Sequence, residues 1–185
     1  MKTDFVSPGR ARSAAFAWPA LMLLALASSA CSDRIPKRPT IEEPPRLSSM
    51  IHVADAGESR QIVSGFHEVE GGSWRWTERK FSVQLRPPAG AAQNGAALVV
   101  QLSVPQNSID KLKTLTLTAS INGTAFPPET YRAAGGYTFR RDIPANLLTG
   151  DAVKIDFQLD HALEPAGPEL RQLGLVVSNL ALVQR

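Results

Sequence analysis

Four runs of the sequence alternate between apolar and polar residues, and this period of two is the strongest constraint on the fold. The apolar members of the runs are Phe81, Val83 and Leu85; Leu98, Val100, Leu102 and Val104; Leu115, Leu117, Ala119 and Ile121; and Val153, Ile155, Phe157 and Leu159. Successive side chains of a β-strand point to opposite faces, so each run predicts a strand with one buried and one solvated face.

Turn signals separate these runs. Asn122-Gly123 joins two strand-like segments and favours a tight type I′ hairpin, while Pro-Pro and Gly-Gly pairs at 87–88, 127–128 and 135–136 mark other connections. Residues 144–148 predict one helical turn, and no long 3.6-residue pattern competes with the strands. The sequence therefore predicts an all-β fold, an antiparallel β-sandwich or jelly roll.

Three segments fit this pattern less simply. Tyr137, Phe139 and Ile143 share a strand phase, but Arg141 occupies the same phase, so the strand is expected to leave the core there. Residues 173–183 are almost continuously apolar, and the interruption at Ser178-Asn179 favours a bulge or a centrally buried strand. Residues 50–59 are compatible with a first edge strand or with a linker.

The N-terminus has the organisation of an export signal. Residues 1–12 are positively charged overall, residues 13–27 form an apolar stretch, and residues 28–30 are small. An apolar stretch of about fifteen residues has the length of a signal-peptide core and is short for a membrane span. Residues 1–30 are therefore predicted to be a cleaved signal peptide.

Cys31 is the sole cysteine of the chain and directly follows this segment. The order of basic residues, apolar core, small residues and cysteine resembles the bacterial lipoprotein signal. The resemblance implies that Cys31 carries acyl chains such as palmitate and anchors the protein to a membrane of the cell envelope, facing the periplasm or the outer membrane. Ser28 stands where that family usually has an aliphatic residue, which leaves cleavage by an ordinary signal peptidase and secretion as the alternative.

The segment after the cysteine is predicted to be a spacer. Residues 32–49 contain four prolines and mixed charges with few large apolar side chains, a composition that cannot build a core and favours extended conformations. The predicted organisation is thus a signal peptide over 1–30, a lipidated N-terminus with a flexible Pro-rich tether over 31–59, and a β-sandwich domain over 60–185.

A family resemblance covers residues 115–159. The stretch runs from a strand through Asn122-Gly123, the aromatic segment Tyr137-Thr138-Phe139, Pro144 and Gly150 to the strand at residues 153–159. This order is similar to the galactose-binding-like jelly roll of many carbohydrate-binding modules. The resemblance implies a jelly-roll fold and a non-catalytic domain that binds carbohydrate or envelope polysaccharide.

The candidate ligand-binding residues lie within residues 65–79. Trp74 and Trp76 share a strand phase, so they lie on one face, where they could stack on sugar rings. The neighbouring side chains that could hydrogen-bond sugar hydroxyls are Arg75, Glu78, Arg79 and His67. The alternative interpretation is that the tryptophans fill the core. A buried pair would favour a structural or assembly protein of the envelope that binds another protein through its sandwich.

No catalytic or metal site is predicted. Glu68, Glu70 and Glu78 lie on one local hairpin rather than across a cleft, as a glycosidase pair would require. No Gly-x-Ser-x-Gly motif occurs, and the three histidines, His52, His67 and His161, lack the spacing of metal ligands. The domain is therefore expected to be neither an enzyme nor dependent on a cofactor.

Charge argues against nucleic acid as a partner. Three of the basic residues, Lys2, Arg10 and Arg12, leave with the predicted signal peptide, so the remaining chain is nearly neutral and has no basic stripe with interleaved aromatics. Arg171, which follows a Pro-rich loop, is instead expected to form an ion pair with Glu70, Glu78 or Asp142.

The anchor at Cys31 is tested by replacing the thiol. Each buried methylene of an acyl chain adds about 0.8 kcal/mol to membrane affinity, so several chains hold a protein firmly. We expect the wild-type chain in the membrane fraction and Cys31→Ala in the soluble fraction, while Ser32→Ala, as the neighbouring control, stays with the membrane. Recovery of the wild type in the soluble fraction would show that the protein is secreted without an anchor.

Overall fold

The computed structural model describes residues 47–185. The predicted signal peptide, Cys31 and most of the predicted tether lie outside these residues. Within residues 47–185, no helix combines the length and the apolar character needed to cross a membrane.

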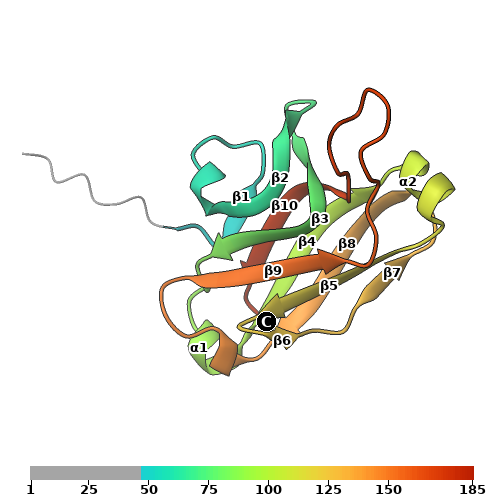
Figure 1. Cartoon of the computed structure of the whole chain (residues 1–185). Helices are drawn as coiled ribbons and strands as arrows, with labels where there is room; N and C mark the ends of the chain where they lie inside the picture. Colours follow the sequence, from blue (N-terminus) through green and yellow to red (C-terminus); the bar gives the residue numbers. More distant parts are fainter. Residues whose placement is uncertain (1–46) are drawn as a thin grey trace, which may run out of the picture. The chain divides into compact units, whose positions relative to one another are not determined.

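Ten strands dominate the structure, and every pairing between them is antiparallel (Figure 1). The strands are β1 (Met50–His52), β2 (Ile62–Glu70), β3 (Trp74–Leu85), β4 (Ala96–Val104), β5 (Leu115–Ile121), β6 (Thr124–Ala125), β7 (Glu129–Tyr131), β8 (Gly135–Ile143), β9 (Val153–Leu159) and β10 (Val176–Val183). The helices are α1 (Ala91–Asn94) and α2 (Gln106–Leu112), and two 3-10 turns span Ser59–Gln61 and Ala145–Leu147. The prediction of an all-β antiparallel fold is confirmed.

A single curled sheet forms both layers of the sandwich. Its strand order is β6-β5-β9-β3-β10-β4-β8, with β1 added to β10, β2 to β3 and β7 to β5. In Figure 1, β9 and β5 lie in front of β10, β4 and β8. Strand β3 joins the layers, because Trp76 near its beginning pairs with Val176 of β10, whereas Lys80 further along pairs with Gln158 of β9.

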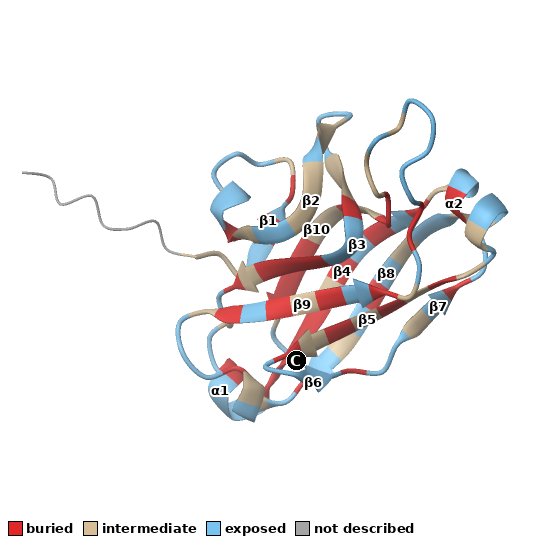
Figure 2. Cartoon of the chain, viewed as in Figure 1, coloured by how far each residue is buried: buried red, intermediate tan, exposed pale blue. Residues whose placement is uncertain are grey.

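The core lies between the two layers. Every apolar residue of the four alternating runs is buried, and the buried and exposed positions alternate along the strands in Figure 2. Phe81 stacks on Phe157 with ring centroids 4.7 Å apart, and Phe66 of β2 contacts Phe81 edge to face at 5.3 Å. Full burial of one such side chain stabilises the fold by roughly 1.5–3 kcal/mol.

The predicted turn and bulge are also confirmed. Asn122 and Gly123 have φ angles of 50° and 80°, the left-handed pair that a type I′ hairpin requires. The register between β10 and β4 shifts between Val177 and Asn179, which places the irregularity at Ser178. The predicted helical turn after Pro144 is the 3-10 turn Ala145–Leu147.

Strand β8 does not leave the core at Arg141, contrary to the sequence expectation. The Arg141 guanidinium lies 4.1 Å from the centroid of the Phe139 ring and donates hydrogen bonds to the Glu129 carboxylate at 3.0 Å and the Pro127 carbonyl at 2.6 Å. These partners come from the segment around β7. Arg141 therefore connects β8 to the segment around β7 by side-chain contacts and closes the seam between these two strands.

The sheet begins before Arg60, the residue at which the sequence pattern predicts the start of the domain. Ile51 of β1 and Val53 are fully buried, and the Val53 N–H donates to the Ser178 carbonyl at 3.0 Å. Of the two readings of residues 50–59, the edge strand is thus correct for Met50–His52. Helix α2 was not expected, because seven residues are too few to show a helical period.

Gly65 permits the closest approach within the β2–β3 pair. Its φ is +73°, and a Cβ at this position would lie 2.0 Å from the Lys80 carbonyl oxygen and 2.7 Å from the Phe81 Cα. The register of β2 on β3 shifts before this position, between Ile62 and Ser64, across it, between Ser64 and Phe66, and after it, between Phe66 and Val69. Only a residue without a side chain fits this irregularity.

We expect Gly65→Ala to lower the free energy of unfolding by about 3 kcal/mol or more, because it adds a backbone clash to the left-handed strain. Gly123→Ala is the matched control: its φ is +80° but nothing lies within 4 Å of the added Cβ. Strain alone costs about 1–2 kcal/mol there. Denaturant unfolding measures both changes, and equal losses at the two positions would contradict the proposed clash.

Candidate functional site

Trp74 and Trp76 form an aromatic pair at the start of β3. Their ring centroids are 6.4 Å apart with an interplanar angle of 79°, an edge-to-face arrangement, and both side chains are half-buried. Within residues 47–185, neither indole N–H donates a hydrogen bond to another residue. The pair therefore has exposed ring surface and free donors, although packing covers part of each ring.

The hairpin turn before β3 positions the first of these rings. Gly71 and Gly72 have φ angles of +56° and +65°, and a Cβ at Gly71 would lie 2.8 Å from the Trp74 Nε1. The indole thus lies back over the turn. A side chain at Gly71 would displace it, so the Gly-Gly sequence determines where the aromatic surface begins.

The pairing of neighbouring strands extends the face that contains Trp76 across four strands. Trp76 pairs with Val176, Val176 with Ser103, and Ser103 with Gly136. Directly paired residues lie on one face of a sheet, so all four residues belong to the outward face of β3, β10, β4 and β8. Adjacent strands are about 4.8 Å apart, which places the backbone of Ser103 about 10 Å from that of Trp76.

A shallow polar trough of about 330 Å³ lies at the far end of this row. Its lining residues are Gln101, Leu102, Ser103, Gly136, Tyr137, Thr138 and Ser178. The Thr138 hydroxyl donates to Gln101 Oε1 at 3.0 Å, which orients the amide, and within residues 47–185 no group accepts from the amide N–H. The trough therefore offers amide donors and hydroxyl groups next to the row that begins at Trp76.

An ion-pair cluster anchors the long loop before β10 to the β2–β3 hairpin. Arg171 donates to Glu70 Oε1 at 2.6 Å and, through two nitrogens, to Glu169 Oε1 and Oε2 at 2.8 Å and 2.9 Å. Glu70 pairs directly with Trp74, so the cluster lies beside the aromatic pair. The expectation that Arg171 pairs with Glu70, Glu78 or Asp142 is confirmed for Glu70.

The same contacts change the acidity of the cluster. Hydrogen bonds from the Arg171 side chain and backbone lower the pKa of Glu169 to about 2, and the bonds to Glu169 and Glu70 raise the pKa of Arg171. Bidentate arginine–carboxylate pairs are among the stronger charge-assisted hydrogen bonds. Within the loop, Glu169 thus stays ionised and paired with Arg171 across the whole neutral range.

Of the four predicted polar ligands, three bond to the protein itself. Arg75 donates to the Val53 carbonyl at 2.7 Å and the His67 carbonyl at 3.0 Å, which ties β1 to the β2–β3 pair. His67 Nε2 is 2.7 Å from the Gln172 carbonyl oxygen, and Arg79 Nε donates to the Leu159 carbonyl at 3.2 Å. Glu78 is exposed.

The structure thus brings together Trp74, Trp76, Glu70 and Arg171, whereas the predicted polar ligands Arg75, His67 and Arg79 bond to other parts of the protein. The residues of the polar trough were not predicted. Gln101 and Ser103 alternate with buried leucines and valines, so the sequence marks them only as a solvated face. Within residues 47–185, no three His, Cys, Asp or Glu side chains are grouped as a metal ion would need.

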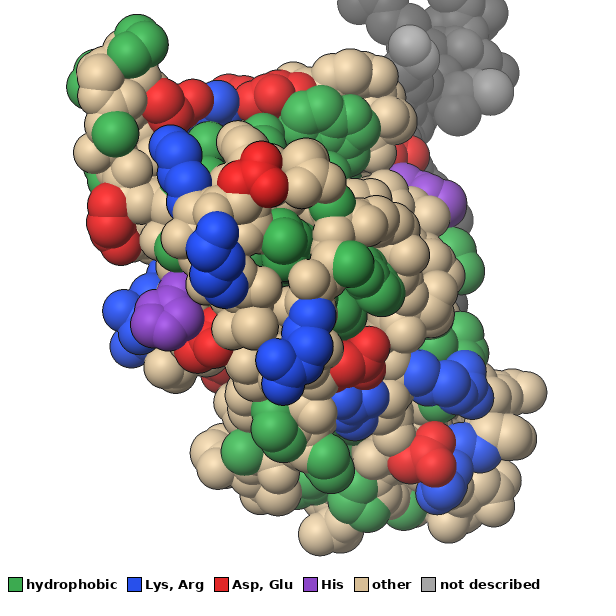
Figure 3. Space-filling view, turned by 90° about the vertical axis from the view of Figure 1, so that its right-hand side faces the viewer, with side chains coloured by type: hydrophobic (Ala, Val, Ile, Leu, Met, Phe, Trp, Pro, Cys, Tyr) green, Lys and Arg blue, Asp and Glu red, His purple; other side chains and the backbone are tan. Residues whose placement is uncertain are grey.

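One face of the domain is mixed in charge: in Figure 3, lysine and arginine side chains are interspersed with acidic and apolar ones on the face that is turned to the viewer. This distribution agrees with the near-neutral charge of the chain without its first thirty residues.

Comparison with known proteins gives little further guidance. No protein-family model and no curated protein matches the chain. Among solved structures, a family GH115 4-O-methyl-α-glucuronidase with specificity for decorated arabinogalactans aligns with a TM-score of 0.44 at 9% identity, over 77% of this chain and 18% of the glucuronidase chain. A CBM4 structure aligns with a TM-score of 0.32 at 10% identity, over 72% of this chain and 84% of that one. These values are too low to transfer a site or a ligand.

The acidity of Glu169 makes the loop anchor testable. Its pKa is lowered from 4.5 to about 2, so the ion pair of Glu169 with Arg171 within the loop is fully present above about pH 4.5 and is lost as the pH falls through about 2. We expect the side-chain carboxyl carbon of Glu169 to titrate in NMR spectra with a midpoint near pH 2. In Glu169→Gln this titration step is absent.

Asp142→Asn is the control, since it breaks only the separate Arg185–Asp142 pair. A Glu169 titration midpoint near pH 4.5 in the wild type would contradict the lowered pKa.

Proposed function

We propose that residues 50–185 form a non-catalytic carbohydrate-binding domain that binds glycan or envelope polysaccharide on the outward face of β3, β10, β4 and β8. The observation that carries this proposal is the half-buried Trp74–Trp76 pair, whose two indole N–H groups have no hydrogen-bond acceptor among residues 47–185. The row of residues from Trp76 to the polar trough supports it, because it extends the face beyond the rings.

The chemistry of this face suits a sugar. A sugar ring has an apolar face that packs on an aromatic ring and hydroxyl groups that need hydrogen-bond partners at its edge. The tryptophans offer the first kind of surface, and Gln101, Ser103 and Thr138 offer the second. Ligand sites generally combine apolar walls with a few placed polar groups.

A non-catalytic role is proposed for the glutamates of the hairpin. The Glu70 carboxylate accepts a hydrogen bond from Arg171, and Glu70 lies on the same local β2–β3 pair as Glu68 and Glu78. In the proposed function the Glu70 carboxylate positions the loop beside the aromatic pair, and no catalytic role is assigned to Glu68 or Glu78.

The proposal includes the cell envelope as the place of action. The predicted signal peptide, the acylated Cys31 and the Pro-rich residues 32–49 would hold the domain at a membrane and let it reach a polysaccharide nearby. The support for this part is the order of residues at the N-terminus.

A second candidate function is the binding of an envelope protein. Leu170, at the loop that the Arg171 cluster anchors, is 82% exposed, a high value for a large apolar side chain in an ordered loop. A rigidly held apolar side chain is a usual contact at protein interfaces. This candidate predicts a partner that cross-links to the loop and no affinity for sugars.

Trp76→Ala tests the carbohydrate-binding proposal. Truncation of a central aromatic contact costs about 2 kcal/mol, so we expect at least a tenfold loss of affinity for a retarding polysaccharide in affinity gel electrophoresis. A panel of soluble β-1,3-glucan, β-1,4-glucan, xylan and arabinogalactan serves as ligands. Trp76→Phe should retain part of the affinity, because it keeps a ring at this position.

Val63→Ala is the matched control, since Val63 is 48% exposed on β2 and its truncation removes apolar surface elsewhere. It should bind like the wild type. Equal retardation of the wild type and Trp76→Ala by every polysaccharide would reject the aromatic face as the binding site and favour the protein-binding candidate.

A further inference from the structure

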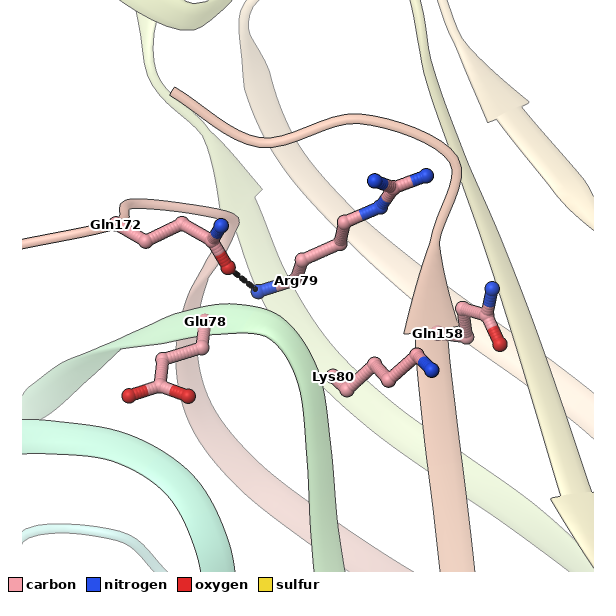
Figure 4. A pocket seen from close by; sticks show the side chains of 5 residues that line it. All are labelled: Glu78, Arg79, Lys80, Gln158 and Gln172. Atoms are coloured by element: carbon pink, nitrogen blue, oxygen red, sulfur yellow. Dashed lines mark hydrogen bonds between the residues drawn. The ribbon is translucent and has the colours of Figure 1, made fainter. Parts of the chain in front are cut away.

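Three consecutive charged residues are exposed where β3 passes from β10 to β9. Glu78, Arg79 and Lys80 lie at this point of the strand and, with Gln158 of β9 and Gln172 of the long loop, line an open pocket of about 400 Å³. Figure 4 shows the Lys80 side chain extending toward Gln158 and the Arg79 guanidinium extending to a separate point, while the Glu78 carboxylate points away from both.

The two cations of the pocket keep unused hydrogen-bond donors. The Arg79 backbone N–H donates to Gln172 Oε1 at 2.9 Å and its Nε to the Leu159 carbonyl at 3.2 Å, which hold the side chain in place. Within residues 47–185, no side chain or carbonyl accepts from the Arg79 Nη atoms or from the Lys80 Nζ. Lys80 pairs directly with Gln158, so its ammonium and the Gln158 amide share one face.

The nearby carboxylates do not neutralise these cations. Glu164 accepts from the Gln172 amide at 3.0 Å and 3.2 Å. Asp160 accepts from the backbone N–H groups of Thr116 and His161, each at 2.8 Å. Neither carboxylate forms an ion pair with Arg79 or Lys80. Among the residues that line the pocket, two cations stand against the single carboxylate of Glu78, and their Nη and Nζ atoms have no acceptor within residues 47–185.

Polar groups continue from this pocket along the outer face of β9 and β5. Gln158 also lines a neighbouring groove of about 390 Å³, whose other lining residues are Thr116, Thr118, Ser120, Gly123, Ala125 and Asp160. Thr118 pairs directly with Gln158, so the hydroxyl, the amide and the Lys80 ammonium form one row across three strands. A small free anion would use only the basic end of this surface.

We propose that this pocket is a second binding site, which takes the carboxylate of an acidic sugar. The Lys80 ammonium, beside the Gln158 amide, binds the carboxylate, and the Arg79 guanidinium, which extends from the next position of the strand to a separate point of the pocket, binds another oxygen of the glycan. The Gln158 amide and the hydroxyls of the groove bind the hydroxyls of the ring and of its neighbours. The pocket has the volume of a small-ligand site rather than that of an ion site.

The inference rests on the proposed function only in that the carrier of the carboxylate is a sugar. The pocket is formed by β3 and β9, whereas the aromatic pair lies where β3 pairs with β10, so the two sites are tested separately. Together they predict a glycan ligand that contains uronic acid residues.

The test is an NMR titration of the protein with two matched sugars. Methyl β-glucuronide and methyl β-glucoside differ only in the carboxylate. We expect the glucuronide to shift the amide signals of Arg79, Lys80 and Gln158, and the glucoside to leave them unchanged. The double variant Arg79→Gln/Lys80→Gln should weaken glucuronide binding by about tenfold or more, since it removes both charge-assisted contacts.

Arg86→Gln/Lys154→Gln is the matched control, because it removes the same two charges from exposed positions outside the pocket. It should bind glucuronide like the wild type. Inorganic phosphate and sulfate complete the titration and should shift these signals less than the glucuronide does.

Each other outcome rejects the proposal. Equal shifts with glucuronide and glucoside would remove the role of the carboxylate, and larger shifts with phosphate or sulfate would make the pocket a site for free inorganic anions. If none of the four compounds shifted these signals, the pocket would not be a binding site. Trp76→Ala should retain the glucuronide shifts, so a failure of the aromatic face and a failure of this pocket are distinguishable.

Discussion

The forked pairing of β3 is the constraint on which the rest of the structure depends. One edge of this strand hydrogen-bonds to β10 near Trp76 and to β9 from Lys80 onward, so a single strand holds both layers of the sandwich. The backbone between these points is paired by the loop, since the Thr77 N–H donates to the Leu175 carbonyl and the Thr77 carbonyl accepts from Gly174. Both proposed sites lie along this strand, one on each side of the fork.

The local features of the sequence predicted the local features of the fold. Alternation identified the buried faces of four strands, and the Asn122-Gly123 pair identified a turn, because both signals are contained in a few consecutive residues. Arg141 was recognised as an anomaly but misinterpreted. Its partners, Glu129 and Pro127, become neighbours only when the curled sheet brings β7 to β8, and no local pattern reports that contact.

In the candidate site, too, the local features were predictable from the sequence and the long-range contacts were not. The shared phase of Trp74 and Trp76 was sufficient to place them on one face, but whether that face is core or surface depends on the pairing of Trp76 with Val176, far along the chain. Arg75 illustrates the limit most clearly. Its residue type and its position between the two tryptophans suggest a ligand-binding role. Its guanidinium, however, donates to the carbonyl groups of Val53 and His67, which only the folded chain brings together.

The seam closed by Arg141 has a consequence for association between molecules. Strand β8 pairs with β4 on one edge, and within residues 47–185 its other edge has no backbone partner. An unpaired edge can template the addition of a strand from a second chain, and proteins commonly prevent this with a charge placed at the edge. Because the Arg141 guanidinium is drawn across that edge to Glu129 and Pro127, an incoming strand would have to displace it and break its ion pair. The residue that interrupts the apolar pattern of β8 therefore also opposes intermolecular β-pairing.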